Sequence, residues 1–407
     1  MKKEKYIKKI NIIADDKIPF LNGVLDSYAN VKYLAGSKTT AEVIKNFSSD
    51  ALITRTRTKC DEKLLINSNV KFIGTATIGH DHIDKEFCLQ NNIIWENAPG
   101  CNASSVAQYI ASVIINIATE DNLDLRDLTL GIVGVGNVGS KIKKMAQNLG
   151  LKVILNDPPK ELENSTNLKY NDLNYVLENS DIITIHTPLT YTNQSEHPTF
   201  HLADEKFFNK MKQTAYFINS GRGEVSNTIA LKNALKNKLI KDAILDVWEN
   251  EPNIDEELLK LTRYGTAHIA GYSLDGKANG TAQTINNIAN FFNELPRELK
   301  TWYPDNIPVP EEIEISFDFA QTKLSKIEDF NKILCQIINL SYDINSDSSL
   351  LKANHSKFEK LRGNYQLRRE FHCFKVEFIN NKNIENKQLF TRLTTLLLSL
   401  NFSITTK

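Results

Sequence analysis

Thr129-Leu-Gly-Ile-Val-Gly-Val-Gly-Asn-Val-Gly-Ser140 is the stretch that decides the fold of this 407-residue chain. A short apolar run, too short for a helix, leads into Gly134, Gly136 and Gly139. Residues 141–149 then have the pattern of an amphipathic helix. The first glycine allows a tight turn, the second lets the backbone approach a pyrophosphate, and the third lets the helix pack on the strand. The stretch therefore predicts a dinucleotide-binding strand, turn and helix, with free N–H groups at the helix N-terminus for the phosphates.

A second buried strand is predicted at residues 151–156, and Asp157 follows it directly, 18 residues after the third glycine. A carboxylate at this place can accept hydrogen bonds from the adenosine ribose and would repel a 2′-phosphate. We therefore predict NAD, and not NADP, as the cofactor. A surface aspartate before a Pro-Pro turn is the alternative interpretation of Asp157.

Composition limits the class of protein. The 49 Lys and Arg residues balance 49 Asp and Glu residues, so neither nucleic acid nor a membrane is expected as a partner. At roughly 150 residues per domain, the length predicts two or three domains. No apolar run approaches the roughly 18 residues that span a bilayer, and the apolar patch after the basic residues 1–10 is too short for a signal peptide. The five cysteines have no metal-ligand spacing, as expected of reduced thiols in a cytoplasmic protein.

Short apolar runs alternate with helical patterns in the first hundred residues. Strands are predicted at residues 10–14, 31–34, 51–54 and 71–76, and a helix at about 18–28. This alternation predicts a parallel sheet with ligand groups at the carboxyl ends of its strands. His80, Asp81, His82 and Asp84 crowd together after the last of these strands. Because adjacent ligands without a second cluster make a poor metal cage, we interpret them as turn residues and predict no metal site.

A long apolar helix reaching about Ala118 is predicted to carry the chain into a second sheet. Further strands are predicted at residues 181–186, 215–219 and 242–245, and each ends in polar or small residues. A doubly wound sheet places its site at such strand ends. The fold class expected is therefore α/β, with two doubly wound parallel sheets.

Three side chains after these strands suit the oxidation of a 2-hydroxy acid: Arg222, Glu251 and His268. The reaction needs a base for the hydroxyl proton and a cation for the carboxylate, while hydride leaves for nicotinamide. Histidine titrates in the useful range, a carboxylate can orient its ring, and a guanidinium binds a carboxylate with two hydrogen bonds. Each residue alone has a structural explanation, but their joint occurrence after a dinucleotide turn favours a catalytic set.

The glycine turn, His186-Thr-Pro, Asn219-Ser-Gly-Arg-Gly and Leu245-Asp-Val-Trp-Glu-Asn-Glu-Pro together resemble the motifs of the D-isomer-specific 2-hydroxyacid dehydrogenase family. The resemblance covers nearly the whole chain and implies two Rossmann-like domains. Residues 74–84 and 358–370 resemble a branch of the family that acts on a phosphorylated 2-hydroxy acid. The second segment is the more discriminating, because most relatives lack such a tail.

The resemblance implies a role for each matching residue. Arg222 would bind the substrate carboxylate, His268 would exchange the hydroxyl proton and Glu251 would hold His268. The residues implied at the NAD site are Gly134, Gly136, Asn137, Val138, Gly139, Asp157, Thr187, Asp246 and Gly271. The residues implied at the substrate are Thr56, Thr77 and Tyr272.

The tail follows a proline-marked linker and is predicted to form a small α/β unit, with helices near 321–342 and 387–400 and a strand at 371–378. The resemblance implies that it forms a homodimer interface. The predicted domains are residues 1–100 with 272–296 for substrate, 101–271 for NAD and 297–407 for dimerisation. Arg362, Arg368 and Arg369 are interpreted either as solvated helix charges or as ligands of a phosphate, in this chain's own site or in a partner's.

Two other functions stay open. One is a related dehydrogenase acting on 3-phosphoglycerate, which the segment 358–370 makes less favoured. The other is a non-catalytic protein that senses NAD; the joint presence of Arg222, Glu251 and His268 favours an enzyme instead. Two modes of cofactor use also stay open: NAD exchanges freely, or it stays bound and is recycled by a 2-oxo acid.

Overall fold

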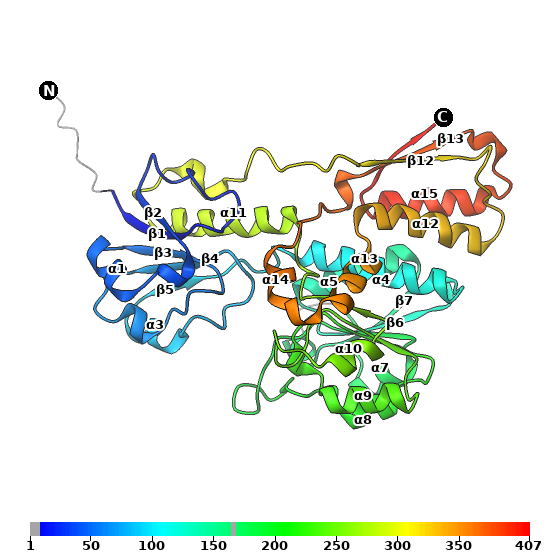
Figure 1. Cartoon of the computed structure of the whole chain (residues 1–407), viewed down its shortest axis with the longest axis horizontal. Helices are drawn as coiled ribbons and strands as arrows, with labels where there is room; N and C mark the ends of the chain where they lie inside the picture. Colours follow the sequence, from blue (N-terminus) through cyan, green and yellow to red (C-terminus); the bar gives the residue numbers. More distant parts are fainter. Residues whose placement is uncertain (1–8, 164–167) are drawn as a thin grey trace. The chain divides into compact units, whose positions relative to one another are not determined.

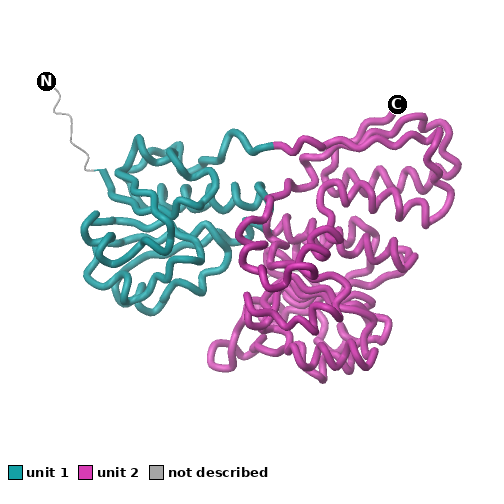
Figure 2. The backbone as a smooth tube through the Cα atoms, in the orientation of Figure 1, with its two compact units in different colours: residues 1–102, 273–308 teal, residues 103–272, 309–407 magenta. Residues whose placement is uncertain are grey.

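The computed structural model describes residues 9–163 and 168–407, and the chain forms two compact units (Figures 1 and 2). Unit 1 contains residues 1–102 and 273–308, and unit 2 contains residues 103–272 and 309–407. Most of the basic N-terminal stretch lies outside the described residues. Within the described part of the chain, no helix is both long and apolar enough to cross a membrane.

Unit 1 is built on a five-stranded parallel sheet in the order β2-β1-β3-β4-β5. The strands are β1 (Asn11–Asp15), β2 (Asn30–Leu34), β3 (Ala51–Thr54), β4 (Phe72–Thr75) and β5 (Ile94–Glu96). The helices are α1 (Ala41–Phe47), α2 (Glu62–Leu65), α3 (Lys85–Gln90) and α11 (Leu274–Phe291). Separate apolar cores cover the two faces of the sheet, one of them under α11. A Cβ on Gly74 would lie 2.7 Å from Thr284 Cγ2, so the glycine lets α11 pack directly on β4.

The helix predicted at residues 18–28 is wrong. Ile18, Leu21 and Leu25 are buried, which is the helical spacing behind the prediction. Phe20 and Gly23, however, have φ values of 64° and 84°, and a right-handed helix cannot continue through positive φ. The segment instead forms successive turns that bury the same apolar side chains.

Unit 2 contains a six-stranded parallel sheet in the order β11-β10-β9-β8-β6-β7. The strands are β6 (Thr129–Val133), β7 (Lys152–Asn156), β8 (Ile182–Ile185), β9 (Tyr216–Asn219), β10 (Asp242–Leu245) and β11 (Tyr264–Gly265). The helices are α4 (Ala103–Glu120), α5 (Asn137–Leu149), α6 (Pro158–Glu163), α7 (Leu173–Asn179), α8 (Glu205–Lys210), α9 (Thr228–Lys236) and α10 (Glu256–Leu261). β7 pairs with one side of β6 and β8 with the other, so the strand order reverses at β6. Open parallel sheets bind their ligands at such a switch point, beyond the carboxyl ends of the strands.

The tail adds a three-stranded parallel sheet to unit 2, in the order β12-β13-β14. Its strands are β12 (Glu314–Asp318), β13 (Lys375–Ile379) and β14 (Ser403–Thr406), and its helices are α12 (Ile327–Ser341), α13 (Ile344–Ala353), α14 (Phe358–Gly363) and α15 (Lys387–Ser399). The fold class is therefore confirmed, with two doubly wound parallel sheets and a small C-terminal α/β part. β12 was not predicted, because only Phe317 of its five residues is buried and the strand follows the prolines of the linker.

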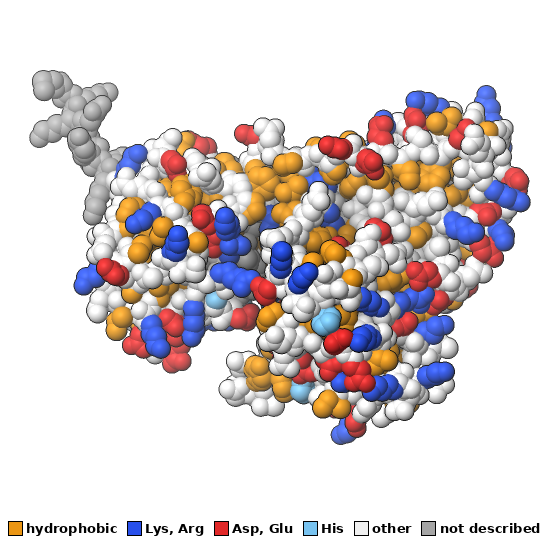
Figure 3. Space-filling model, in the orientation of Figure 1, with side chains coloured by type: hydrophobic (Ala, Val, Ile, Leu, Met, Phe, Trp, Pro, Cys, Tyr) orange, Lys and Arg blue, Asp and Glu red, His pale blue; other side chains and the backbone are white. Residues whose placement is uncertain are grey.

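One continuous apolar core joins α4, β6 and the tail helices α12 and α15. A partly buried amide network adds polar contacts to this core. Asn116 Nδ2 donates to Asn339 Oδ1 (2.9 Å), and Asn345 Nδ2 donates to Asn116 Oδ1 (3.0 Å). Basic and acidic side chains are interspersed on the face of unit 2 in Figure 3, in keeping with the balanced charge. The tail is thus an integral part of the unit that contains the glycine turn.

Candidate active site

The glycine turn lies at the switch point, between β6 and α5. Gly134 has a φ of 89°, and a Cβ there would lie 2.8 Å from the His186 carbonyl. A Cβ on Gly139 would lie 2.1 Å from the Gly134 oxygen, so this glycine lets the helix approach the turn. A Cβ on Gly136 would meet open space, and no side chain caps α5 at this residue. The three glycines therefore serve the turn, the packing and the open approach to the helix N-terminus that a pyrophosphate needs.

Asp157 follows β7 and reaches back to the turn. Its Oδ2 accepts a hydrogen bond from Val135 N (2.7 Å), and its Oδ1 accepts one from Lys160 N (3.2 Å). Lys160 Nζ in turn donates to Val135 O (2.7 Å). The half-buried carboxylate thus fastens the turn to α6, and its contact with a ribose stays a prediction.

Two buried hydroxyls lie at neighbouring strand ends. Thr187 Oγ1 follows β8 and Ser220 Oγ follows β9, and neither has a hydrogen-bond partner among the described residues. Buried hydroxyls normally have partners, so an unsatisfied pair beside a glycine turn fits a site for a polar ligand. Together with the open backbone at Gly136, these hydroxyls fit a dinucleotide. Of the other predicted cofactor residues, Asn137 is exposed and Val138 is half-buried at the start of α5.

Arg222 is presented by a loop that a side-chain amide holds in shape. Asn219 Oδ1 accepts from Gly221 N (3.0 Å), and Asn219 Nδ2 donates to Arg222 O (2.9 Å). A Cβ on Gly223 would lie 2.0 Å from the Trp248 carbonyl oxygen, so only glycine lets this loop lie against the next one. The half-buried guanidinium is therefore carried by a fixed turn.

Asp246 holds the loop that carries His268. It is 1% exposed, and its Oδ1 accepts from Thr266 Oγ1 (2.7 Å) and Ile269 N (2.7 Å), while Oδ2 accepts from Ala270 N (2.9 Å). The backbone of His268 also donates to Asp246 O (2.8 Å). The resemblance implied Asp246 at the NAD site; its carboxylate is bonded to this loop, and its place at the cofactor stays a prediction. The half-buried Gly271 follows Ala270 directly.

His268 and Glu251 form a hydrogen-bonded pair. His268 Nδ1 lies 2.8 Å from Glu251 Oε2, and Glu251 Oε1 accepts from Trp248 N (3.1 Å). Burial raises the pKa of Glu251, but the hydrogen bond from His268 and the charges of His268 and Arg362 outweigh burial and leave this pKa below its usual value. A carboxylate can only accept, so Nδ1 carries the proton and Nε2 is the ring nitrogen left to exchange a proton with a substrate.

Tyr272 lies at the end of the same loop and contacts the tail. Its hydroxyl accepts a hydrogen bond from Arg362 Nε (3.2 Å), and its ring packs edge-on against Tyr365 at 6.2 Å. Arg362 also places its Nη1 3.6 Å from Glu251 Oε2. The structure thus brings the predicted Glu251, His268 and Tyr272 together with a tail residue that sequence reasoning had left without a definite role.

Arg368 is not a solvated helix charge, and its position also corrects the phosphate interpretation. It is 8% exposed, and all five N–H donors of its guanidinium are used. The acceptors are Gln108 Oε1, Tyr365 Oη and the carbonyl oxygens of Ser105, Ile269, Ala270 and Tyr272. Arg369 is equally buried, at 7% exposed. No signal in the sequence predicted the burial of Arg368, because most of its acceptors come from two distant segments.

Thr56 and Thr77, the other predicted substrate residues, belong to unit 1. Thr56 is exposed in the turn after β3. Thr77 follows β4, and its hydroxyl lies 2.9 Å from Thr75 Oγ1 and donates to Gly79 O (2.9 Å). Both are at carboxyl ends of strands, where a doubly wound sheet presents ligand groups.

The polar cluster after β4 has structural contacts. Asp84 caps α3 by accepting from Phe87 N (3.0 Å), and the ring of His80 packs against Trp95 at 5.2 Å. Burial lowers the pKa of His82. Within residues 9–163 and 168–407, no three His, Cys, Asp or Glu side chains are grouped as metal ligands would be.

Two family models match this chain, and both matches lie within unit 2. The family model described as D-isomer specific 2-hydroxyacid dehydrogenase, NAD binding domain, matches residues 108–270. A model described as a domain of unknown function matches residues 316–393 of the tail.

Several similar proteins are named erythronate-4-phosphate dehydrogenase. Those from Bacteroides fragilis and Bacteroides thetaiotaomicron are 42% and 43% identical to this chain, over 90% of this chain and 99% of the relative. The protein of that name from Klebsiella pneumoniae is 36% identical, over 90% of this chain and 94% of its own.

Solved structures share the fold. D-lactate dehydrogenase from Aquifex aeolicus, complexed with NAD and lactic acid, is 25% identical with a TM-score of 0.57, over 69% of this chain and 95% of that one. The apo form of D-mandelate dehydrogenase from Rhodotorula graminis is 21% identical with a TM-score of 0.60, over 70% and 95%.

Proposed function

The chain belongs to the erythronate-4-phosphate dehydrogenases of the D-isomer-specific 2-hydroxyacid dehydrogenase family, and we propose that it oxidises 4-phospho-D-erythronate to 2-oxo-3-hydroxy-4-phosphobutanoate. It is an NAD-dependent D-2-hydroxyacid dehydrogenase. The reaction supplies the biosynthesis of pyridoxal 5′-phosphate, vitamin B6. The relatives that match almost end to end favour this substrate over 3-phosphoglycerate.

The observation that supports catalysis most directly is the hydrogen bond of 2.8 Å between His268 Nδ1 and Glu251 Oε2. A histidine whose Nδ1 is held by a carboxylate is oriented for proton exchange at Nε2. Glu251 follows β10 and His268 follows β11, and both strands belong to the sheet whose strand β6 leads into the glycine turn. A protein that only senses NAD would not need this pair.

His268, Glu251 and Arg222 have different roles in the proposed reaction. His268 Nε2 takes the proton of the C2 hydroxyl, and Glu251 stabilises the imidazolium that results. Arg222 binds the substrate carboxylate through its guanidinium and fixes the C2 carbon. Bound NAD would supply the acceptor for the hydride that leaves this carbon as the 2-oxo acid forms. Thr56, Thr77 and Tyr272 are proposed to contact the substrate.

The residues proposed to hold NAD are Gly134, Gly136, Asn137, Val138, Gly139, Asp157, Thr187 and Gly271. The open backbone at Gly136 suits the pyrophosphate, and the unsatisfied hydroxyl of Thr187 suits a polar group of the cofactor. Asp246 is proposed to act at this site through the loop it holds. We also propose that the protein is a cytoplasmic homodimer and that the tail supplies the dimer interface.

An assay of NAD reduction tests the proposal. Turnover is measured with 4-phospho-D-erythronate and with 3-phosphoglycerate, and again with an added 2-oxo acid in case NAD remains bound between turnovers. We expect turnover with the first substrate only. Binding of NADH without oxidation of either substrate would contradict the proposal and favour a sensor.

The His268→Ala variant tests the mechanism. We expect kcat to fall by about 10²- to 10⁴-fold, which is the contribution of a positioned general base. The dissociation constant of NAD should stay within about twofold of the wild type, because the glycine turn is untouched. A variant with near-normal turnover would exclude His268 as the proton acceptor.

A further inference from the structure

The tail segment that contains α14 is anchored to the loop carrying His268. Arg368 donates to the carbonyl oxygens of Ile269 (3.1 Å), Ala270 (2.6 Å) and Tyr272 (3.0 Å). Its guanidinium also lies over the ring of Tyr342, 4.2 Å from the centroid. These contacts hold the tail against the loop through a buried cation whose donors are all used.

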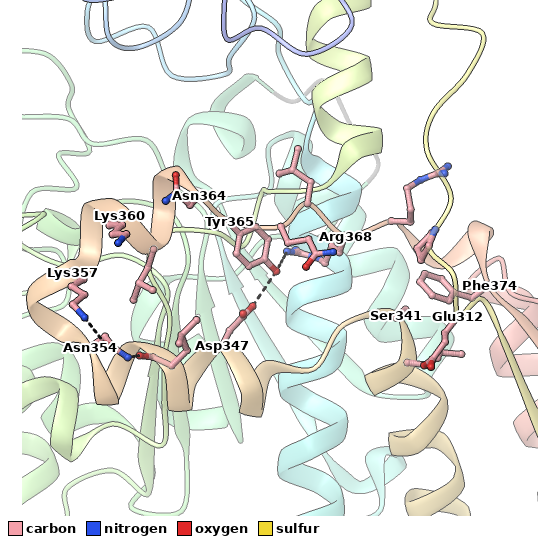
Figure 4. A pocket seen from close by; sticks show the side chains of 17 residues that line it. Glu312, Ser341, Asp347, Asn354, Lys357, Lys360, Asn364, Tyr365, Arg368 and Phe374 are labelled. Atoms are coloured by element: carbon pink, nitrogen blue, oxygen red, sulfur yellow. Dashed lines mark hydrogen bonds between the residues drawn. The ribbon is translucent and has the colours of Figure 1, made fainter.

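Tyr365 continues this anchor along the tail. Its hydroxyl donates to Asp347 Oδ2 (3.0 Å) and accepts from Arg368 Nη1 (3.3 Å), and Figure 4 shows both bonds at the edge of a pocket of about 720 Å³. Ser348 of α13 adds a bond from Gly265 N to its Oγ (3.1 Å). The position of α14 relative to the loop is therefore set by several independent bonds.

Arg362 is the residue that this anchored segment presents to the site. Its Nε donates to the hydroxyl of Tyr272 (3.2 Å), and its Nη1 lies 3.6 Å from Glu251 Oε2. That carboxylate oxygen is the one bonded to His268 Nδ1. The side chains of Arg362 and Glu251 are only 23% and 17% exposed, so solvent screens their attraction less than it would at an open surface.

We propose that Arg362 is a positioning residue of the dehydrogenase site, delivered by the tail, which holds Glu251 on His268 and Tyr272 toward the substrate. The proposal rests on the function proposed above, since it assigns Arg362 a role through the His268 and Glu251 pair. A planar guanidinium can serve both partners at once, because it presents donors in fixed directions. The tail thereby contributes to catalysis within its own chain.

The charge of Arg362 also bears on the pH dependence of the pair. The groups that face its guanidinium are Glu251, Tyr272 and Glu359, and His268 shares the carboxylate. Arg362 is one of the causes that lower the pKa of Glu251. Its removal would make the pair easier to protonate, so the acid limb of the profile of kcat/KM against pH would move to higher pH.

The Arg362→Gln and Arg362→Lys variants test this proposal in the full-length enzyme with NAD and 4-phospho-D-erythronate. We expect Arg362→Gln to lower kcat/KM by about 10- to 100-fold, the range for loss of a hydrogen bond to a charged group. Its acid limb should move up by about one pH unit. Arg362→Lys retains the positive charge but lacks the planar guanidinium with its fixed donor directions. It should therefore have the pH profile of the wild type and a kcat/KM between those of the wild type and Arg362→Gln.

Lys360→Gln is the matched control, because it removes an exposed cation from the same helix and should leave activity unchanged. Wild-type activity in Arg362→Gln, with an active wild type, would overturn this proposal alone. A loss of activity without a shift of the acid limb, together with weaker NAD binding and a lower Tm, would overturn it in favour of a structural role. An inactive wild type would instead contradict the proposed function.

Discussion

The Asp246→Asn variant tests how this chain holds the loop that carries His268. The carboxylate accepts three hydrogen bonds, from Thr266 Oγ1 and Ile269 N at Oδ1 and from Ala270 N at Oδ2. Thr266 Oγ1 in turn accepts from the buried hydroxyl of Tyr109 (2.9 Å). Every donor points at the carboxylate, so both of its oxygens are required as acceptors.

An asparagine retains only one acceptor oxygen. In its better orientation this oxygen keeps the two donors at Oδ1, and the amide nitrogen then faces Ala270 N. The buried N–H left without an acceptor costs about 1–3 kcal/mol. The two remaining bonds lose their charge assistance, which costs roughly 1 kcal/mol each. We therefore expect the free energy of unfolding to fall by about 3–5 kcal/mol.

Urea unfolding followed by circular dichroism measures this change, and Asp127→Asn is the matched control. Asp127 is exposed, so its substitution should change the free energy of unfolding by less than about 0.5 kcal/mol. Turnover of Asp246→Asn should also fall, because the backbone of His268 is bonded to Asp246. A variant within 0.5 kcal/mol of the wild type would refute this reasoning. Unchanged stability with weaker NAD binding would assign Asp246 a direct contact with the cofactor.

Two further predictions concern the glycine turn and its neighbour His186. Gly136→Ala should leave the Tm unchanged and weaken NAD binding, because the new Cβ enters open space where the pyrophosphate approaches. Gly139→Ala should lower the free energy of unfolding by at least about 1–3 kcal/mol, because the new Cβ would lie 2.1 Å from the Gly134 oxygen. Equal Tm values for the two variants would contradict this account. Burial lowers the pKa of His186 to about 3 from an ordinary value near 6.5, so the unfolded chain binds this proton at a higher pH than the folded chain. The free energy of unfolding of the wild type should therefore fall as the pH falls from about 6.5 toward 3, by up to about 1.4 kcal/mol per pH unit. The His186→Gln variant should lack this part of the loss. Parallel curves of unfolding free energy against pH for the two proteins would count against this role of His186.

The elements around the cofactor site could be predicted because short segments encode them. The apolar run before Gly134 and the amphipathic pattern after Gly139 specify β6 and α5 without help from the rest of the chain. The helix expected at residues 18–28 shows the limit of this reasoning. Its apolar spacing is helical, yet Phe20 and Gly23 adopt positive φ and the side chains are buried by turns. Periodicity reports which side chains are buried, and several backbone conformations can bury the same ones.

The pairing of Glu251 with His268 could be expected, because the two side chains follow neighbouring strands of one sheet. The direction in which the Asp246 carboxylate points could not be expected from the sequence. A carboxylate after a strand can face a ligand or the next loop, and the choice depends on where the N–H groups of residues 269 and 270 point. That direction is a property of the folded loop and leaves no trace in residue spacing.

The sequence by itself determined the strand, turn and helix that form the cofactor site, the residue types that follow the strands, and the family to which their motifs belong. Only the tertiary structure decided what the tail does at this site. Arg362 and Arg368 are similar residues a few positions apart, yet one contacts Glu251 and the other is buried among backbone carbonyls. The physical reason is that their partners lie in distant segments, which meet only when the apolar core shared by α4 and the tail has formed.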